Sequence, residues 1–256
     1  MTESSRKAAL VTGGAHRIGK SLCLALAREG WAVAIHYGSS ADSAEALARE
    51  ITQRGGKAAS VSADLSSEDE TLAAFDKAQQ TIGPLSLIVN NASIFEKENW
   101  DDVTAESWTR HLNINLRAPY ILSQALAREL PVPQTGNIIN IIDQRVWNLT
   151  PHFVSYTVSK AGLWTLTQTL ALALAPRIRV NGIGPGPTLP NPRQDADAFK
   201  RQAEATPLER AVNPDEIAAA MCYLLSAPGV TGQMIAVDSG EHLGWAQPKQ
   251  GQTFDG

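Results

Sequence analysis

The chain has 256 residues, of which 43% are apolar and 19% are charged, and its formal net charge is −4 at pH 7. These values exclude an intrinsically disordered or collagen-like chain, and they are sufficient for one large hydrophobic core. The slightly acidic balance gives no electrostatic reason to bind nucleic acid or an anionic membrane surface. The length fits one domain of about 250 residues.

The two cysteines, Cys23 and Cys222, lie far apart and in no spacing typical of a metal or redox site. Two free thiols in a reducing compartment are therefore expected, and no metal site is predicted. The first apolar run, 8–12, is too short for a signal peptide, and the most apolar window, 163–175, is too short for a membrane span. The sequence thus predicts a cytoplasmic protein.

Seven short runs rich in Val, Ile, Leu and Ala are predicted to be strands. Most are continuously apolar rather than alternating, which is typical of strands buried on both faces of a parallel sheet. Longer segments between them are predicted to be helices, and several begin with a good capping signal. The predicted strands are 8–12, 32–37, 58–63, 85–90, 137–142, 178–183 and 234–237, and the predicted helices lie near 18–29, 41–54, 68–81, 105–129, 154–174 and 215–225.

This alternation of strands and helices predicts a single α/β domain. Its sheet is expected to be parallel, seven-stranded and doubly wound, with helices on both faces. We place the domain at residues 1–245 and interpret the polar residues 246–256 as a loose tail.

A glycine-rich turn, residues 12–19, follows the first predicted strand and opens the first predicted helix. In this context glycines let the backbone approach a pyrophosphate, which then lies on the helix N-terminus. Arg17 replaces the middle glycine of the usual fingerprint, so its guanidinium is expected to point at a phosphate or at a molecule above it. We therefore predict a nucleotide site that includes Gly13, Arg17 and Ile18, and the alternative is a tight turn without a ligand.

The end of the second predicted strand indicates which nucleotide is bound. A free ribose 2′-hydroxyl usually meets Asp or Glu about 20 residues after the turn. Here the nearest carboxylate is Asp42, and hydroxyls, a histidine and Arg17 are available to a 2′-phosphate, so NADPH is favoured over NADH. The residues assigned to this position are His36, Tyr37, Gly38, Ser39 and Ser40, although His36 alone also fits a surface histidine with satisfied hydrogen bonds.

Tyr156 and Lys160 lie four residues apart on one face of the predicted helix 154–174. An adjacent ammonium favours the phenolate and lowers a tyrosine pKa from about 10 toward working pH. Tyr156 is therefore a candidate general acid.

Taken in order, these motifs resemble the short-chain dehydrogenase/reductase family over residues 7–240. The resemblance implies a Rossmann fold, oxidoreductase activity and a homo-oligomer, either a homotetramer or a dimer. It rests on the glycine turn, residues 90–93 after the fourth strand, Asn115, Tyr156 with Lys160, Asn181, Pro185 with Gly186, and residues 237–240.

Residue roles follow from that resemblance. Tyr156 becomes the proton donor, Lys160 holds the nicotinamide ribose and lowers the pKa of Tyr156, and Asn115 holds a water of the proton relay. Asp64 and Leu65 match the adenine contacts. The remaining residues implied at the cofactor are Asn91, Ala92, Ser93, Pro185, Gly186 and Thr188.

Asp143 departs from the general family pattern, which has a serine thirteen residues before the tyrosine. An aspartate accepts hydrogen bonds from an amino-heterocycle or passes a proton in a closed site, but it is a poor partner for a ketone oxygen. With Arg17, His36, Ser93 and Phe95, it resembles the pteridine reductase branch of the family.

In that branch a phenylalanine and the nicotinamide sandwich a flat pterin ring. The implied substrate contacts are Arg17, Ser93, Phe95, Asp143 and Tyr156, whereas Phe95 as a hydrophobic plug and Asp143 as a capping carboxylate remain alternatives. The lid over the substrate is expected within residues 189–207. Trp147 and His152 are expected near the pocket, and Trp164 at a subunit interface.

The leading hypothesis is NADPH-dependent reduction of a dihydropterin or dihydrofolate to the tetrahydro form, with a proton delivered by Tyr156 and Asp143. A ketone or 3-oxoacyl thioester reductase is the first alternative, and Asp143 argues against it. A non-catalytic NADPH-binding sensor is the second, and the intact set of Tyr156, Lys160 and Asn115 argues against it.

Overall fold

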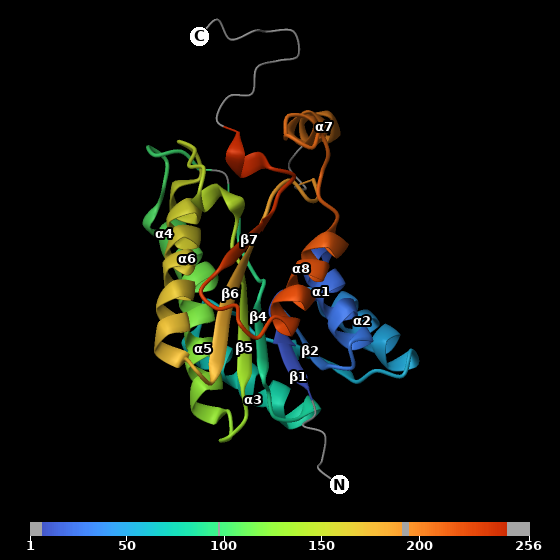
Figure 1. Cartoon of the computed structure of the whole chain (residues 1–256). Helices are drawn as coiled ribbons and strands as arrows, with labels where there is room; N and C mark the ends of the chain where they lie inside the picture. Colours follow the sequence, from blue (N-terminus) through green and yellow to red (C-terminus); the bar gives the residue numbers. More distant parts are fainter. Residues whose placement is uncertain (1–6, 97, 191–194, 245–256) are drawn as a thin grey trace, which may run out of the picture.

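The computed structural model describes residues 7–96, 98–190 and 195–244. It confirms the predicted α/β domain with one parallel, seven-stranded sheet, in the order β3-β2-β1-β4-β5-β6-β7 (Figure 1). The strands are β1 (Ala8–Val11), β2 (Ala32–Tyr37), β3 (Ala58–Ser62), β4 (Leu87–Asn90), β5 (Gly136–Ile141), β6 (Ile178–Pro185) and β7 (Met234–Val237). The proposed tail, 246–256, lies outside the described residues.

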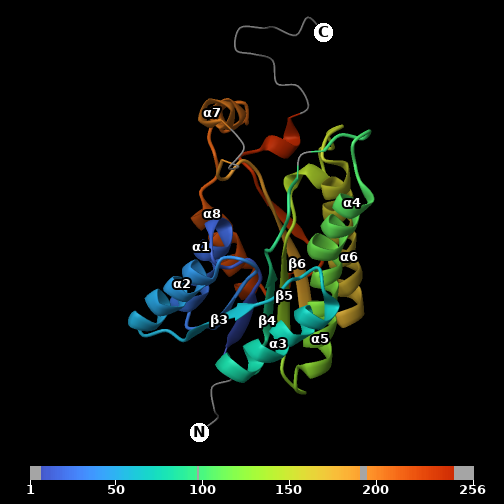
Figure 2. The ribbon, with the colours of Figure 1, turned by 180° about the vertical axis from the view of Figure 1, so that it is seen from behind.

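Two layers of helices cover the sheet because the continuous apolar strands present buried side chains to both faces. Figures 1 and 2 show α1, α2 and α8 on one side and α4, α5 and α6 on the other. Each layer has its own core, one with Leu22, Leu47 and Ile217, the other with Phe75 and Leu126. The helices are α1 (Arg17–Arg28), α2 (Ala41–Gln53), α3 (Glu68–Ile82), α4 (Ala105–Leu112), α5 (Ala118–Glu129), α6 (Val154–Leu174), α7 (Ala196–Glu204) and α8 (Pro214–Ser226).

The long helix predicted over 105–129 is wrong in detail, because a π-helical turn (Asn113–Arg117) separates α4 from α5. Pro119 lies in the first turn of α5 and has no N–H. It therefore cannot supply the α-helical hydrogen bond to the carbonyl four residues earlier, that of Asn115. Such π-bulges occur frequently at functional sites.

The expected lid segment contains a helix that the sequence pattern did not reveal. Helix α7 is capped by the Asp195 side chain, which accepts from the Asp197 N–H, and it buries Ala203. Nine mostly polar residues give too short a periodic pattern to distinguish a helix from a loop.

Strand order reverses direction between β1 and β4, and the carboxyl ends of the strands open into a crevice there. In doubly wound sheets ligands bind at this switch point. The fold thus directs the search for a site to the loops that follow β1, β4, β5 and β6.

Candidate active site

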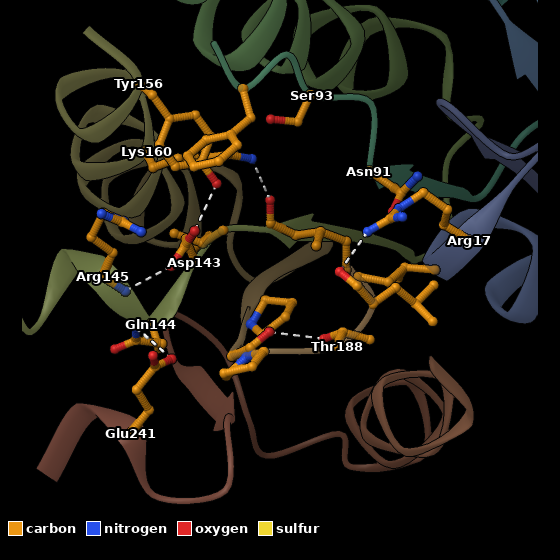
Figure 3. A pocket seen from close by; sticks show the side chains of 18 of the residues that line it. Arg17, Asn91, Ser93, Asp143, Gln144, Arg145, Tyr156, Lys160, Thr188 and Glu241 are labelled. Carbon is orange, nitrogen blue, oxygen red and sulfur yellow. Dashed lines mark hydrogen bonds between the residues drawn. The ribbon is translucent and has the colours of Figure 1, made fainter. Parts of the chain in front are cut away.

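A pocket of about 450 Å³ lies at this crevice (Figure 3). It brings together residues from segments far apart in the sequence: the glycine turn, the loop after β4, the loop after β5, helix α6 and the loop after β6. The predicted site residues that line it are Arg17, Ile18, Asn91, Ser93, Phe95, Asp143, Tyr156, Lys160, Pro185, Gly186 and Thr188.

The glycine turn is fixed by the loop after β4. The Asn91 side-chain amide donates to the carbonyls of Thr12 (2.9 Å) and Gly13 (3.0 Å), and the Thr12 hydroxyl accepts the backbone N–H groups of Asn91 and Ala92 (both 2.9 Å). A Cβ at Gly13 would lie 2.9 Å from the Ala92 Cα, so the turn and this loop pack at backbone distance. Asn91 and Ala92 therefore shape the turn itself.

Helix α1 begins directly after this turn with no side-chain cap and no acidic residue in its first turn. Its first N–H groups and its dipole thus favour an anion at this position. A Cβ on Gly19 would lie 2.1 Å from the Gly13 carbonyl, which shows how tightly the chain turns. The geometry fits a pyrophosphate.

His36 does not have the side-chain environment expected of a 2′-phosphate contact. The ring is buried, its Nδ1 accepts the Gly13 N–H (3.1 Å), and its Nε2 lies 3.1 Å from the Ala63 carbonyl. Burial lowers the pKa of His36, in keeping with a neutral ring whose Nε2 donates to that carbonyl. The imidazole supports the turn from behind, and this corrects the prediction for its side chain.

The other residues assigned to the adenosine end lie outside the lining of the pocket, along the edge formed by the ends of β2 and β3. Gly38, Ser39 and Asp64 are exposed, Tyr37 and Ser40 are half-buried, and Leu65 is buried. Asp64 accepts the Ser66 N–H (2.8 Å), and this hydrogen bond lowers the pKa of its carboxyl. The structure leaves their assignment to a cofactor as a prediction.

Tyr156, Asp143 and Lys160 meet at the centre of the pocket. The Tyr156 hydroxyl donates to Oδ2 of Asp143 (2.7 Å), and Oδ1 of Asp143 accepts the Arg145 N–H (2.8 Å). Asp143 therefore also caps the short 3₁₀ turn Gln144–Val146, so the capping alternative and the site role coexist. The buried Lys160 Nζ donates to the Ile141 carbonyl (2.9 Å).

The expected direction of the Tyr156 pKa shift is wrong for this arrangement. Burial, followed by the neighbouring Asp143 charge, raises the pKa of Tyr156 well above its ordinary value. Burial also lowers the pKa of Lys160 to about 8. Tyr156 is consequently held as a protonated donor toward Asp143.

Asn115 lies behind the pocket, in the π turn. Its side-chain oxygen accepts the Ile94 N–H (2.9 Å), and its amide donates to the Ile94 carbonyl (3.1 Å) and to the Ser159 hydroxyl (3.1 Å). The side chain thus ties the loop after β4 to α6. The backbone carbonyl of Asn115 lacks its α-helical donor because of Pro119, and the predicted water relay stays a prediction.

Aromatic rings form one wall of the pocket. Phe95 stacks on Phe153 at 4.4 Å and meets the Tyr156 ring edge-on at 4.7 Å. The Arg145 guanidinium lies over both phenylalanines, 5.0 Å from the Phe153 ring and 5.9 Å from the Phe95 ring. Phe95 still exposes 37% of its surface and lines the pocket.

Arg17 connects the glycine turn with the loop after β6. Its guanidinium donates to the carbonyls of Leu189 (3.0 Å) and Pro190 (2.9 Å). Its φ of 53° places it in the left-handed region, where the usual fingerprint has glycine. A strained backbone at a ligand site is typical of a functional constraint.

No cluster of His, Cys, Asp and Glu suited to a metal ion occurs among the described residues. Within residues 7–96, 98–190 and 195–244, none of the helices has the length and apolar character needed to cross a membrane.

Comparison with known proteins identifies the family. A family model described as enoyl-(acyl carrier protein) reductase matches residues 13–242. The chain belongs to the short-chain dehydrogenase/reductase family. Members of this family are oxidoreductases, and so is this protein.

Individual relatives within the short-chain dehydrogenase/reductases have different names. A FolM alternative dihydrofolate reductase 1 from Brucella suis, crystallised with NADP, is 47% identical with a TM-score of 0.91, covering 94% of this chain and 97% of that one. An uncharacterized oxidoreductase of Methylorubrum extorquens is 35% identical, covering 94% of this chain and 99% of the relative. A 3-oxoacyl-[acyl-carrier-protein] reductase of Synechocystis is 30% identical, covering 94% and 98%.

Sequence reasoning missed four polar residues in the pocket of this short-chain dehydrogenase/reductase. They are Gln144, Arg145, Gln202 and Glu241, and the Gln144 amide donates to Glu241 (2.9 Å). Burial raises the pKa of Glu241. Arg145 could have been predicted to lie near the pocket, because it follows Asp143 by only two residues. Trp147 and His152 are not among the lining residues, and Trp147 instead meets Trp164 edge-on at 6.2 Å.

Proposed function

We propose that this protein reduces a pteridine, a dihydropterin or dihydrofolate, to the tetrahydro form with NADPH. The observation that carries the proposal is the hydrogen bond from the Tyr156 hydroxyl to Asp143 (2.7 Å) beside the partly exposed ring of Phe95. A ketone oxygen needs a neutral donor, and a carboxylate at this position repels it. The name of the Brucella suis relative, 47% identical, supports a folate-type substrate.

The proposed cofactor fits the residues present. The uncapped start of α1 would receive the pyrophosphate, with Arg17 and Ser93 nearby, and Pro185, Gly186 and Thr188 would border the nicotinamide. An ammonium has three donors, and within the described part of the chain Lys160 uses one on Ile141, which leaves donors for the ribose. Bound NADPH supplies the hydride. The NADP in the Brucella suis structure supports this choice.

The protein side of the reaction is a proton transfer. Reduction of an imine in the ring places a hydride on carbon and a proton on the adjacent nitrogen. Tyr156 carries that proton, and Asp143 orients the hydroxyl. The proton moves from the Tyr156 oxygen to the ring nitrogen as the nitrogen gains basicity.

Phe95 provides the binding surface for the flat ring. An aromatic face favours offset stacking with a heteroaromatic ligand. Phe95 and Tyr156 line the same pocket with their rings in edge contact, so a ligand ring stacked on Phe95 would lie next to Tyr156. Ser93 and Arg17 line the same pocket and are proposed to contact the pteridine edge.

The first test follows absorbance of the reduced nicotinamide with purified protein, NADPH or NADH, and four substrates: dihydrobiopterin, dihydromonapterin, dihydrofolate and an acetoacetyl thioester. We expect NADPH oxidation with at least one dihydropterin or with dihydrofolate, and little with the thioester. Turnover of the thioester alone would contradict the proposal.

A thioester reductase is the second candidate, since the family model and the Synechocystis relative carry acyl-chain names. Asp143→Ser separates the two. A pteridine reductase should lose at least about tenfold in kcat/KM, whereas a thioester reductase should hold or gain rate. Tyr156→Phe should inactivate the enzyme under either hypothesis, and it therefore serves as the reference for complete loss of activity.

We also propose a homotetramer that acts in the cytoplasm. Leu116, Tyr120 and Leu166 line a shallow apolar depression on the outer face of α5 and α6, and Leu172 on α6 exposes 84% of its surface. Such a surface is suited to helix-to-helix association. Sedimentation velocity checks the assembly, and a monomer at micromolar concentration would reject it.

A further inference from the structure

Helix α6, which carries Tyr156 and Lys160, begins without a cap of its own. Its N-cap residue, Phe153, is in the left-handed conformation (φ 61°) and makes no side-chain capping bond, and no acidic residue lies in the first turn. The first N–H groups of a helix need acceptors. Another part of the chain must therefore supply them.

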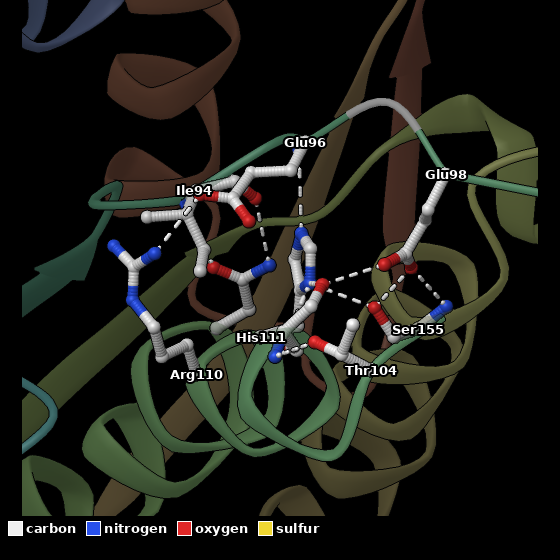
Figure 4. A network of polar contacts seen from close by, with 9 residues as sticks. Ile94, Glu96, Glu98, Thr104, Arg110, His111 and Ser155 are labelled. Atoms are coloured by element: carbon white, nitrogen blue, oxygen red, sulfur yellow. Dashed lines mark hydrogen bonds and ion pairs between the residues drawn. The ribbon is translucent and has the colours of Figure 1, made fainter. Parts of the chain in front are cut away.

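Glu98, from the segment that follows Phe95, provides this cap (Figure 4). Its carboxylate accepts the Ser155 N–H (2.8 Å) and the Ser155 hydroxyl, and its backbone carbonyl accepts the Phe153 N–H (2.9 Å). The side chain of Glu98 is buried, and the Ser107 hydroxyl donates to its second oxygen (2.6 Å). A carboxylate at this position also complements the helix dipole.

The charge of Glu98 is compatible with its burial. Burial raises the pKa of this carboxyl, but the hydrogen bonds from Ser107 and Ser155 outweigh it, so the pKa of Glu98 lies below its ordinary value. An ionised carboxylate accepts several strong hydrogen bonds at once. Glu98 thus fixes the first turn of α6 with a charged group.

His111 on α4 joins the same network. Its Nδ1 lies 3.0 Å from the Ser107 carbonyl and 2.7 Å from the Ser155 hydroxyl, and its Nε2 accepts the Glu96 N–H at 3.4 Å. A carbonyl can only accept, so Nδ1 carries the hydrogen. The fully buried ring therefore ties both the segment after Phe95 and the start of α6 to α4.

The network lies behind the pocket, and Glu98, His111 and Ser155 are not among the residues that line it. The network nevertheless holds the backbone at Glu96 and at Ser155, and each of these residues is next to a lining residue in the sequence. Phe95 precedes Glu96, and Tyr156 follows Ser155. The rings of Phe95 and Tyr156 are in edge contact at 4.7 Å.

We propose that Glu98, with His111 and Ser155, is a positioning device that sets Phe95 and Tyr156 relative to each other, and thereby places the substrate ring against the proton donor. The identity of the substrate rests on the proposed pteridine reductase function. The proposed coupling between the segment after Phe95 and the start of α6 is independent of that function.

The decisive variant is Glu98→Gln, which keeps the shape of the side chain and removes its charge. We expect a rise in dihydropterin KM of roughly tenfold and a fall in kcat, with an unchanged NADPH dissociation constant. The matched control is Thr167→Val, which removes another buried side-chain acceptor from α6, the partner of the Asn140 amide (2.8 Å). The control should lower the melting temperature and leave KM unchanged. An unchanged KM in Glu98→Gln would overturn the proposal.

A double-mutant cycle with Phe95→Ala tests the route of the effect. If Glu98 acts on substrate binding by placing Phe95, Glu98→Gln should raise KM in the wild type but not in the Phe95→Ala background. The kcat effect, which acts through Tyr156, should persist in both. A full, multiplicative KM effect in the Phe95→Ala background would contradict positioning.

Hydrogen exchange gives a readout that needs no substrate. In Glu98→Gln the amides of Phe153, Ser155 and Glu96 should lose protection together, and His111→Asn, which keeps a donor near Nδ1, should restore more of it than His111→Leu. Loss confined to Phe153 and Ser155 would overturn the coupling. If the wild type turns over no pteridine, the proposed function fails, and this exchange pattern alone decides the proposal on positioning.

Discussion

The two sides of the pocket are held in place by different means. On the proposed cofactor side, Asn91, Thr12 and His36 fix the glycine turn, all at or next to the carboxyl ends of β1, β2 and β4. On the proposed substrate side, Phe95 and Phe153 lie on connecting segments, and a buried network around Glu98 and His111 holds those segments to helices α4 and α6.

This difference separates what belongs to the fold from what belongs to this chain. The cofactor side uses strand ends that the parallel sheet already places side by side, so its geometry follows from the register of the sheet. The substrate side uses loops, whose positions depend on particular polar side chains. We therefore expect the loops to determine which substrate binds, and the ends of the strands to determine how the nucleotide binds.

The largest effect is expected where the two sides meet. Tyr156→Phe removes the hydroxyl that donates to Asp143 and should lower kcat by about 10²–10⁴-fold. NADPH affinity should stay within about twofold, because the lost hydroxyl belongs to proton transfer. Steady-state kinetics and fluorescence titration of NADPH measure the two quantities. An unchanged kcat in Tyr156→Phe would show that Tyr156 does not donate the proton.

His36→Leu should damage the cofactor side selectively. It leaves the Gly13 N–H and the Ala63 carbonyl without their buried partner, which we expect to lower the free energy of unfolding by about 2–4 kcal/mol. NADPH should bind more weakly although His36 does not face the pocket, whereas dihydropterin KM at saturating NADPH should change little. Urea unfolding and NADPH titration test this. A rise in the pteridine KM without weaker NADPH binding would contradict the assignment of His36 to the cofactor side.

The pH dependence of kcat/KM for NADPH should turn downward above pH about 8. That ratio reports on the free enzyme, in which burial lowers the pKa of Lys160 to about 8. Below this pH the ammonium is available to the cofactor. Above it the amine is neutral, and the ratio should fall tenfold per pH unit. A downturn that begins only above pH about 10 would point to the Tyr156 hydroxyl instead, whose pKa is raised.

The smallest effect is a comparison of two substitutions at Arg17. Both Arg17→Gly and Arg17→Ala remove the hydrogen bonds to Leu189 and Pro190, but only glycine adopts a φ of 53° without strain. The glycine variant should therefore be more stable than the alanine variant by about 1 kcal/mol. Denaturant midpoints measure the difference, and equal midpoints would mean that Arg17 carries no backbone strain. Both variants should bind pteridine more weakly.

Particular residues show how far the sequence alone could lead. The positions of Tyr156, Lys160, Asp143 and Phe95 could be predicted, and the structure gathers all four around one pocket. The burial of the His36 side chain was not predicted, and the direction of the Tyr156 pKa shift was predicted wrongly. Both depend on burial and on partners distant in the sequence, such as Ala63 and Asp143.

The sequence by itself determined the seven strands, the glycine-rich turn and the spacing of Tyr156 and Lys160, but neither α7 nor the π turn between α4 and α5. The features that it determined arise from local periodicity and from residues that are neighbours along the chain. Only the tertiary structure decided that Glu98 caps α6, that His111 joins two loops, and that Tyr156 remains protonated. Glu98 and Ser155 are 57 positions apart, and no local pattern encodes which distant donor a buried carboxylate will meet.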